Sequence, residues 1–194
     1  YLGYFWPGAA AGAGHFATVT LMITVLTAIN CAGVRQGVWA INFFTAGKLI
    51  PLAIFCLAGL FFMDRSSFSF TVLPEPRALQ QASLLLIFAF GGFESASIPG
   101  DEVIRPRRTI PLAILAGVGF VVILYLTIQL VAMGTFTGLA QSPTPLASAA
   151  ASFLGPAGGV LLTIGAILST TGTNSASVLT GSRMLYALSE GGLL

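Results

Sequence analysis

Two ionisable side chains lie inside long apolar stretches of this sequence. Lys48 interrupts the stretch 36–63, and Glu94 lies within the stretch 78–100. An ionisable group inside hydrocarbon costs at least a few kcal/mol unless it is paired, neutralised or faces a water-filled cavity. Lys48 and Glu94 are therefore the first residues to which we assign chemistry.

Lys48 lies too deep in its apolar stretch to reach water easily. At a helical rise of about 1.5 Å per residue it is about 18 Å from the start of the stretch. That depth exceeds comfortable snorkelling distance in a hydrocarbon core about 30 Å thick, so the ammonium must find partners inside the protein. Pro51 removes an N–H that would bond the Gly47 carbonyl, which loosens the helix beside the lysine. Lys48 is either a fixed ion-pair partner or a group that binds and releases a proton.

Two adjacent glycines, Gly91 and Gly92, precede Glu94. Glycine in a helix interior costs about 1 kcal/mol relative to alanine, so the pair favours local unwinding, although small residues also allow close helix packing. An unwound membrane helix presents carbonyls to a cation and N–H groups to an anion, and a zwitterion needs both. We assign substrate binding to the residues around this break: Phe88, Ala89, Phe90, Gly91, Gly92 and Phe93.

A polar stretch, residues 169–177, follows an apolar one near the end of the chain. Hydroxyl groups in membrane helices often bond their own backbone or a neighbouring helix. They could also coordinate a cation or pair with Lys48, and the sequence leaves the two interpretations open.

The segment 101–109 is the most charged part of the chain. Its arginines can determine topology, because short cytoplasmic loops carry excess Lys and Arg. Alternatively, its acids and bases form salt bridges that open and close a cytoplasmic gate. The proposed gate residues are Asp101, Glu102, Arg105, Arg107, Arg108 and Arg183.

Composition identifies the elements that position these residues. The 194 residues are 56% hydrophobic and only 7% charged, whereas soluble domains have about 25% charged residues. A helix of about 20 apolar residues crosses a membrane. We therefore predict an all-α, polytopic membrane protein forming a single membrane domain over residues 1–194, with a short surface helix within 134–154. Five transmembrane helices are expected, at about 15–34, 36–63, 78–100, 110–134 and 155–183.

The remaining reactive residue types argue against an enzyme. The chain has one histidine, His15, at the mouth of the first span, where it is either an interfacial residue or part of a proton relay. One acid within the membrane and one histidine do not supply the paired aspartates, Ser/His group or metal ligands of an intramembrane hydrolase. Cys31 and Cys56 lie in apolar runs, which argues against a disulfide framework. We expect no metal, no cofactor and no nucleic-acid partner.

The distribution of basic residues predicts an orientation. Arg35, the arginines of the charged loop and Arg183 fall on one side of the predicted spans, and Arg65 and Arg77 fall on the other. The positive-inside rule then places the N-terminal end outside and the C-terminal end in the cytoplasm of a cell membrane. The sequence starts without methionine and stops after a glycine-rich run, so we expect it to be a piece of a longer protein.

Several of these runs resemble one family, the amino acid-polyamine-organocation (APC) superfamily of permeases. The sixth helix and following loop of that family are similar to FGGFESASIPGDEVIRPRRTIPLAI, and its eighth helix is similar to TGTNSASVLTGSRMLYALSEGGLL. Its fifth helix resembles FFTAGKLIPL, and the end of its fourth resembles AINCAGVR. One departure is Arg105, where the family pattern usually has asparagine before the proline.

The resemblance implies helices four to eight of a permease with about twelve, built from two inverted five-helix repeats. It implies a discontinuous sixth helix at Gly91 and Gly92, an aromatic gate at Phe88 and a coupling acid at Glu94. Lys48 would fill the space that sodium occupies in sodium-coupled relatives, with Ser169, Thr170 and Thr173 nearby. The expected function is secondary active transport of amino acids or related organic cations by proton coupling or exchange, with the lipid bilayer and the missing helices of the polypeptide as partners. The alternative is a structural or regulatory membrane module that does not transport by itself.

Overall fold

The structure is a computed structural model that describes residues 2–9, 11–64, 66, 68, 75–93 and 103–192. Every regular element in these residues is helical, as the composition predicts. The elements in chain order are α1 (Leu2–Phe5), η1 (Pro7–Ala9), α2 (Gly12–Cys31), α3 (Val34–Phe62), α4 (Pro76–Phe90), α5 (Pro106–Thr135), η5 (Leu139–Gln141), α6 (Pro145–Leu154) and α7 (Pro156–Glu190).

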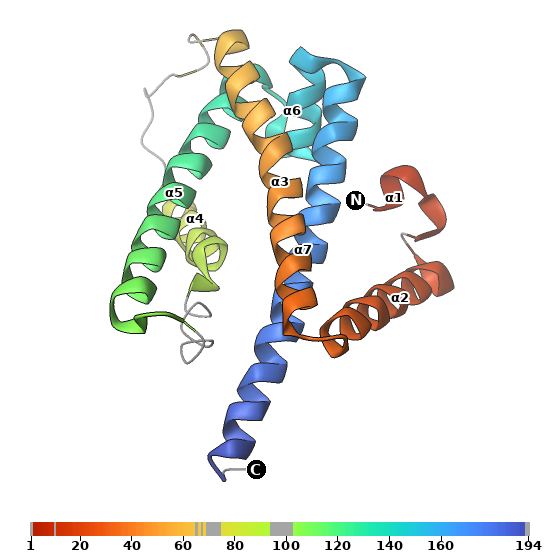
Figure 1. Ribbon diagram of the computed structural model, residues 1–194. Coiled ribbons are helices and arrows are strands. Elements are labelled where there is room, and N and C mark those ends of the chain that lie inside the picture. Colours follow the sequence, from red (N-terminus) through yellow and green to blue (C-terminus); the bar gives the residue numbers. More distant parts are fainter. Residues whose placement is uncertain are drawn as a thin grey trace.

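Helices α3 and α7 form the central pair of the molecule. Figure 1 shows them side by side, with α2 on one side and α5 on the other. Glycines allow the two helices to approach closely: a Cβ atom added to Gly172 would lie 2.7 Å from the Cβ of Phe44, and one on Gly165 would lie 3.1 Å from Pro51. Small residues at such contacts favour association of membrane helices, because they let backbones pack closely without a large side chain between them. The α3–α7 pair is thus the scaffold to which the other helices attach.

The buried core lies at the end of the molecule where α6 packs against α5 and α7. Phe55, Val131, Ala149 and Ala150 are fully buried there, and Leu162 of α7 completes the cluster. The prediction that the segment 134–154 contains a short surface helix is therefore wrong in its placement. The small side chains of α6, rich in alanine, let this helix pack between its neighbours, whereas we had expected it to lie on the surface.

Among the described residues, three helices are long and apolar enough to cross a membrane by length and composition: α2, the 28 residues Arg35–Phe62 of α3, and α5. The other two predicted spans differ from these. The 15 residues of α4 extend about 22 Å, less than a hydrocarbon core of about 30 Å. The 35 residues of α7 extend about 52 Å, past the predicted end at residue 183, and its second half is polar.

The helix ends follow local backbone requirements. The corner between α2 and α3 contains Gly33 with φ of 131°, and α4 ends at Phe90, before Gly92 with φ of 103°. Both φ values lie in the region that side chains disfavour, so glycine is needed at each. The end of α4 at the glycine pair is where the sequence predicts a break. Arg105, which precedes Pro106 and caps α5, adopts a left-handed conformation with φ of 55°.

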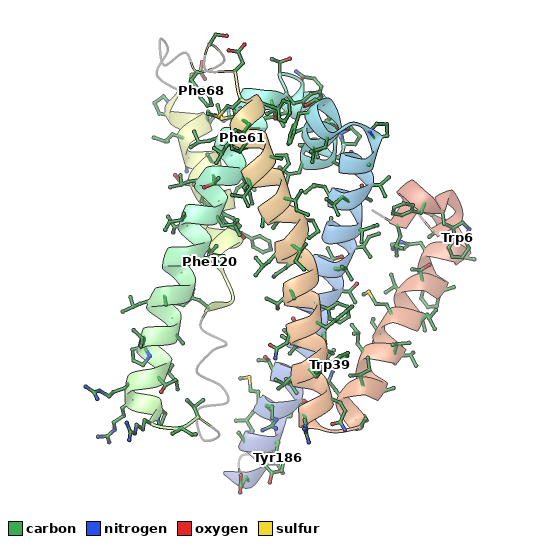
Figure 2. The ribbon with its side chains drawn as sticks, turned by 45° about the horizontal axis from the view of Figure 1, so that its top comes forward. Trp6, Trp39, Phe61, Phe68, Phe120 and Tyr186 are labelled. Carbon is green, nitrogen blue, oxygen red and sulfur yellow. The ribbon has the colours of Figure 1, made fainter. Side chains whose placement is uncertain are left out.

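The ends of the helices that carry the arginines gather at one end of the molecule. In Figure 1 the first turns of α3 and α5 and the last turns of α7 lie toward the lower end, and α7 extends furthest. In Figure 2 Trp39 and Tyr186 mark this end, whereas Phe61 and Phe68 mark the opposite end. The sequence predicted this segregation of the basic residues from span counting alone.

Candidate functional site

A cavity of about 500 Å³ lies between α3, the end of α4 and α7. It brings together three groups that the sequence selected separately, namely the intramembrane lysine, the glycine pair and part of the polar stretch. The described residues that line it are Ile41, Phe44, Thr45, Lys48, Gly91, Gly92, Gly172, Thr173, Ala176, Ser177, Thr180 and Gly181.

Lys48 is half-buried in α3 and lies at the junction of two cavities. The second cavity, of about 170 Å³, lies between α3, α6 and α7 and includes Ser169 and Pro51 in its lining. Within the described part of the chain, the ammonium of Lys48 forms neither an ion pair nor a hydrogen bond. An unpaired ammonium in a partly dehydrated site is costly, so the group is available to a partner that enters the cavity or approaches from elsewhere in the protein.

The end of α4 lines the same cavity through Gly91 and Gly92. The last carbonyls of a helix lack partners within the helix and carry the negative end of its dipole. Two of these carbonyls are occupied: that of Phe88 accepts the N–H of Gly91 at 3.2 Å, and that of Ala89 accepts the hydroxyl of Tyr125 at 3.4 Å. The helix end thus presents a region of negative potential beside the lysine, which favours a ligand that carries a positive group.

The polar stretch of α7 contributes only partly to the cavities. Thr173 and Ser177 line the larger cavity, and Ser169 lines the smaller one. Thr170 is exposed and lines neither of them, and its hydroxyl donates to the carbonyls of Ala166 and Ile167.

Most hydroxyls of this stretch bond the backbone one turn earlier. Thr173 donates to the carbonyl of Ser169 at 3.0 Å, and Ser177 donates to that of Thr173 at 3.0 Å. Their protons are therefore committed to the helix, while their oxygen lone pairs can still accept a hydrogen bond from a cation in the cavity. The intrahelical and the cation-binding interpretations of this stretch are thus compatible.

The aromatic residues around the break do not face one site. The Phe88 side chain is 87% exposed and does not line any cavity described here. Ala89, Phe90 and Phe93 instead line a separate cavity of about 330 Å³ between α4 and α5. Of the six predicted substrate-binding residues, only Gly91 and Gly92 therefore lie at the cavity that contains Lys48.

Tyr125 of α5 is a site residue that we did not predict. Its ring packs against Phe90 with ring centroids 5.3 Å apart, and its hydroxyl donates to the carbonyl of Ala89. It thus holds the last turn of α4 next to the break. One signal could have identified it, because Tyr125 carries a hydroxyl within the otherwise aliphatic run VVILYL. Buried tyrosine hydroxyls usually find a partner.

The predicted gate residues are only partly within the described residues. Asp101, Glu102 and the coupling acid Glu94 lie outside them. Arg105, Arg107 and Arg108 are exposed at the start of α5, and none of the three forms an ion pair in the described part of the chain. Arg183 is half-buried in the last turns of α7.

Comparison with known proteins places the chain in a family. Residues 9–194 match the family model described as amino acid permease, so the chain belongs to the amino acid permease family. It is a multi-pass membrane protein of a transporter family, and this assignment agrees with the APC resemblance of the sequence.

Individual relatives are distant and longer. The chain is 25% identical over 189 residues to a methylthioribose transporter of Bacillus subtilis, covering 97% of this chain and 41% of the relative. It is 26% identical over 175 residues to the chloroplastic cationic amino acid transporter 9 of Arabidopsis thaliana, covering 90% of this chain and 31% of the relative. The vacuolar cationic amino acid transporter 2 of the same plant is 26% identical over 181 residues, covering 90% and 28%. The chain therefore spans less than half the length of each of these three relatives.

Proposed function

We propose that the whole protein is a secondary active transporter of amino acids or related organic cations that works by alternating access, coupled to protons or to exchange. The observation that carries this proposal is the cavity of about 500 Å³ that places Lys48, the glycine-pair end of α4 and Thr173 around one space. Transporters commonly bind their substrates where a helix is interrupted at membrane depth.

The chemistry of the cavity favours a substrate that carries both charges. The end of α4 offers negative potential to an ammonium group, and Lys48 is the one charged side chain among the described lining residues. A zwitterionic amino acid satisfies both groups, and the names of the plant relatives support amino acid transport. Methylthioribose, named for the bacterial relative, is an uncharged sugar that satisfies neither, so it is the natural competitor in a substrate test.

In this proposal Lys48 takes the place of a bound sodium ion, with Ser169 and Thr173 on the facing helix and Glu94 as a second coupling group. Lys48 is half-buried and has no ion pair among the residues that the structure describes, which supports this role, because a fixed ammonium repels a metal cation at the same position. Helices α4 and α7 would complete the five crossings of a cell membrane.

The test is a transport assay with the full-length protein in proteoliposomes. Sodium and proton gradients are imposed separately, and uptake of labelled zwitterionic amino acids, cationic amino acids and methylthioribose is measured. We expect amino acid uptake that responds to the proton gradient or to amino acid loaded inside, and that does not change when sodium is replaced by choline.

Two outcomes would contradict the proposal. Uptake that requires sodium and ignores pH would remove the coupling role of Lys48. Saturable uptake of methylthioribose without competition from any amino acid would overturn the substrate class while leaving the transporter family intact.

A further inference from the structure

A second recess lies in the corner where α2 meets α3, away from the cavity that contains Lys48. It has a volume of about 510 Å³ and is lined by Ile29, Arg35, Gln36, Trp39 and Ala40. The short connection through Gly33 forces α2 and α3 to diverge from this corner, as Figure 1 shows. The walls are apolar except where Arg35 and Gln36 form the edge.

One face of α3 leads out of this recess as a ladder of three side chains. Arg35, Trp39 and Phe43 are spaced four residues apart, so they lie above one another on the helix. Trp39 is 70% exposed and Phe43 is 53% exposed, yet their rings stack with centroids 5.9 Å apart and planes 14° apart. The two rings therefore form an ordered apolar surface rather than two separate side chains.

Arg35 is an exposed side chain in the first turn of α3. Its guanidinium makes no ion pair or hydrogen bond within the described residues. A cation in the first turn of a helix is opposed by the positive end of the helix dipole, and no side chain caps the N-terminus of α3. An anion at this corner would relieve both defects, because it would pair with the guanidinium and meet the uncapped N–H groups.

The order of the ladder matches the order of groups in a lipid leaflet. Arg35 begins the apolar span Arg35–Phe62, which places its guanidinium at the level of lipid headgroups. Trp39 lies about 6 Å deeper, at the usual depth of interfacial tryptophan, and Phe43 lies about 12 Å deeper, among acyl chains.

We propose that this corner binds an anionic phospholipid. The headgroup phosphate contacts Arg35 and Gln36, and one acyl chain lies in the recess along Ile29, Trp39 and Phe43. A soluble anion would pair with Arg35 but leave the aromatic surface uncovered. A purely apolar helix would cover that surface but offer no anion to Arg35. An anionic lipid does both, because its phosphate pairs with Arg35 and its acyl chain covers the rings. A basic residue near the surface favours anionic over zwitterionic lipid by about fivefold.

The experiment uses the full-length protein in detergent. Bound lipid is counted by native mass spectrometry during titration with phosphatidylglycerol or phosphatidylcholine of the same acyl chains. We expect the wild-type protein to bind one phosphatidylglycerol about fivefold more tightly than phosphatidylcholine. Arg35→Gln removes this preference, and Trp39→Ala weakens both lipids. The matched control is Arg107→Gln, an exposed arginine at the same end of the molecule outside the recess, which keeps the preference.

Three results would overturn the proposal. The first is a wild-type protein that retains no lipid or shows no preference, as expected if other helices of the permease cover the corner. The second is an equal loss in Arg107→Gln, because the preference would then reflect the basic end as a whole. The third is equal thermal stabilisation by the soluble headgroup glycerophosphoglycerol, which would assign the site to a free phosphate ester. None of these depends on transport, so the proposal stands or fails separately from the proposed function.

Discussion

Lys48 carries a structural cost that its proposed role in coupling would explain. Its ammonium is half-buried, lies at the junction of two cavities and has no partner within the described residues. An unpaired, partly dehydrated charge does not stabilise a fold. Its position is therefore better explained by a ligand, a proton or a group on another helix that pairs with it during transport.

Replacing Lys48 with methionine should separate these two contributions. Methionine keeps most of the side-chain volume and removes the charge. We expect Lys48→Met to reduce net uptake by more than tenfold, because the cation needed for coupling is missing. The thermal stability of the purified protein should stay the same or rise, because an unpaired charge has been removed.

The control for this variant is Lys48→Arg, which keeps the charge and should preserve folding while altering coupling geometry. Wild-type flux in Lys48→Met would contradict the coupling role and make Lys48 a structural residue.

At the residue scale, the sequence selected Lys48, the glycine pair and Thr173 because charges, adjacent glycines and hydroxyls are costly or unusual inside apolar helices. The structure places these residues around one cavity, and their roles stay predictions. The orientation of Phe90 could not be found this way, because its ring packs against Tyr125 of α5, which is distant in sequence. The left-handed conformation at Arg105 suits the asparagine of the family pattern better than arginine, so it does not explain this sequence departure.

At the scale of helices, the close contact between α3 and α7 holds the site together. Gly172 packs against Phe44, and Gly165 packs against Pro51, on either side of the level of Lys48. The proline that would kink an isolated helix is buried in this contact, which keeps α3 continuous through Pro51. The lysine therefore projects from a rigid two-helix support.

The substitution Gly172→Ala tests this support. A Cβ atom there would lie 2.7 Å from the Cβ of Phe44, which is close to the backbone and cannot rotate away, so the helices must separate. We expect a loss of about 1–3 kcal/mol in stability, measured by thermal or denaturant unfolding in detergent.

Gly119→Ala provides the matched control, because Gly119 is a helical glycine of α5 with nothing within 4 Å of an added Cβ. It should leave stability unchanged or raise it by up to about 1 kcal/mol through helix propensity. A Gly172→Ala variant as stable as Gly119→Ala would show that the α3–α7 contact is not tight.

The sequence predicted where the long helices begin and end, but it did not predict how the short helix α6 packs against them. Apolar runs and the polar, proline-containing segments between them located α2, α3, α5 and α7 to within several residues. The position of α6 could not be predicted, because the alanines of PLASAAASFL are compatible with a surface and with a tightly packed core. Only the partners on α5 and α7, which are distant in sequence, decide between the two.

At the scale of the whole molecule, the arginine-bearing ends of α3, α5 and α7 share one end. If the positive-inside rule applies, this end faces the cytoplasm and Ser66, beyond the other end of α3, faces outside. The charge distribution and the helix arrangement thus predict the same orientation.

Labelling of introduced cysteines tests this orientation. In the full-length protein with reactive native cysteines replaced, we expect Arg107→Cys to react with a membrane-impermeant maleimide only in inside-out vesicles. Ser66→Cys should react only in intact cells or right-side-out vesicles. The reverse pattern would invert the orientation, and labelling of both variants from one side would contradict an odd number of crossings between them.

The length of α7 has a mechanical consequence. From Thr173 at the cavity to Glu190 at its end, the helix runs on without interruption for about 25 Å. If this segment tilts as a rigid body by about 10° at the cavity, its far end moves by about 4 Å. Substrate-sized adjustments beside Lys48 would thereby be magnified into gate-sized movements of the segment that carries Arg183.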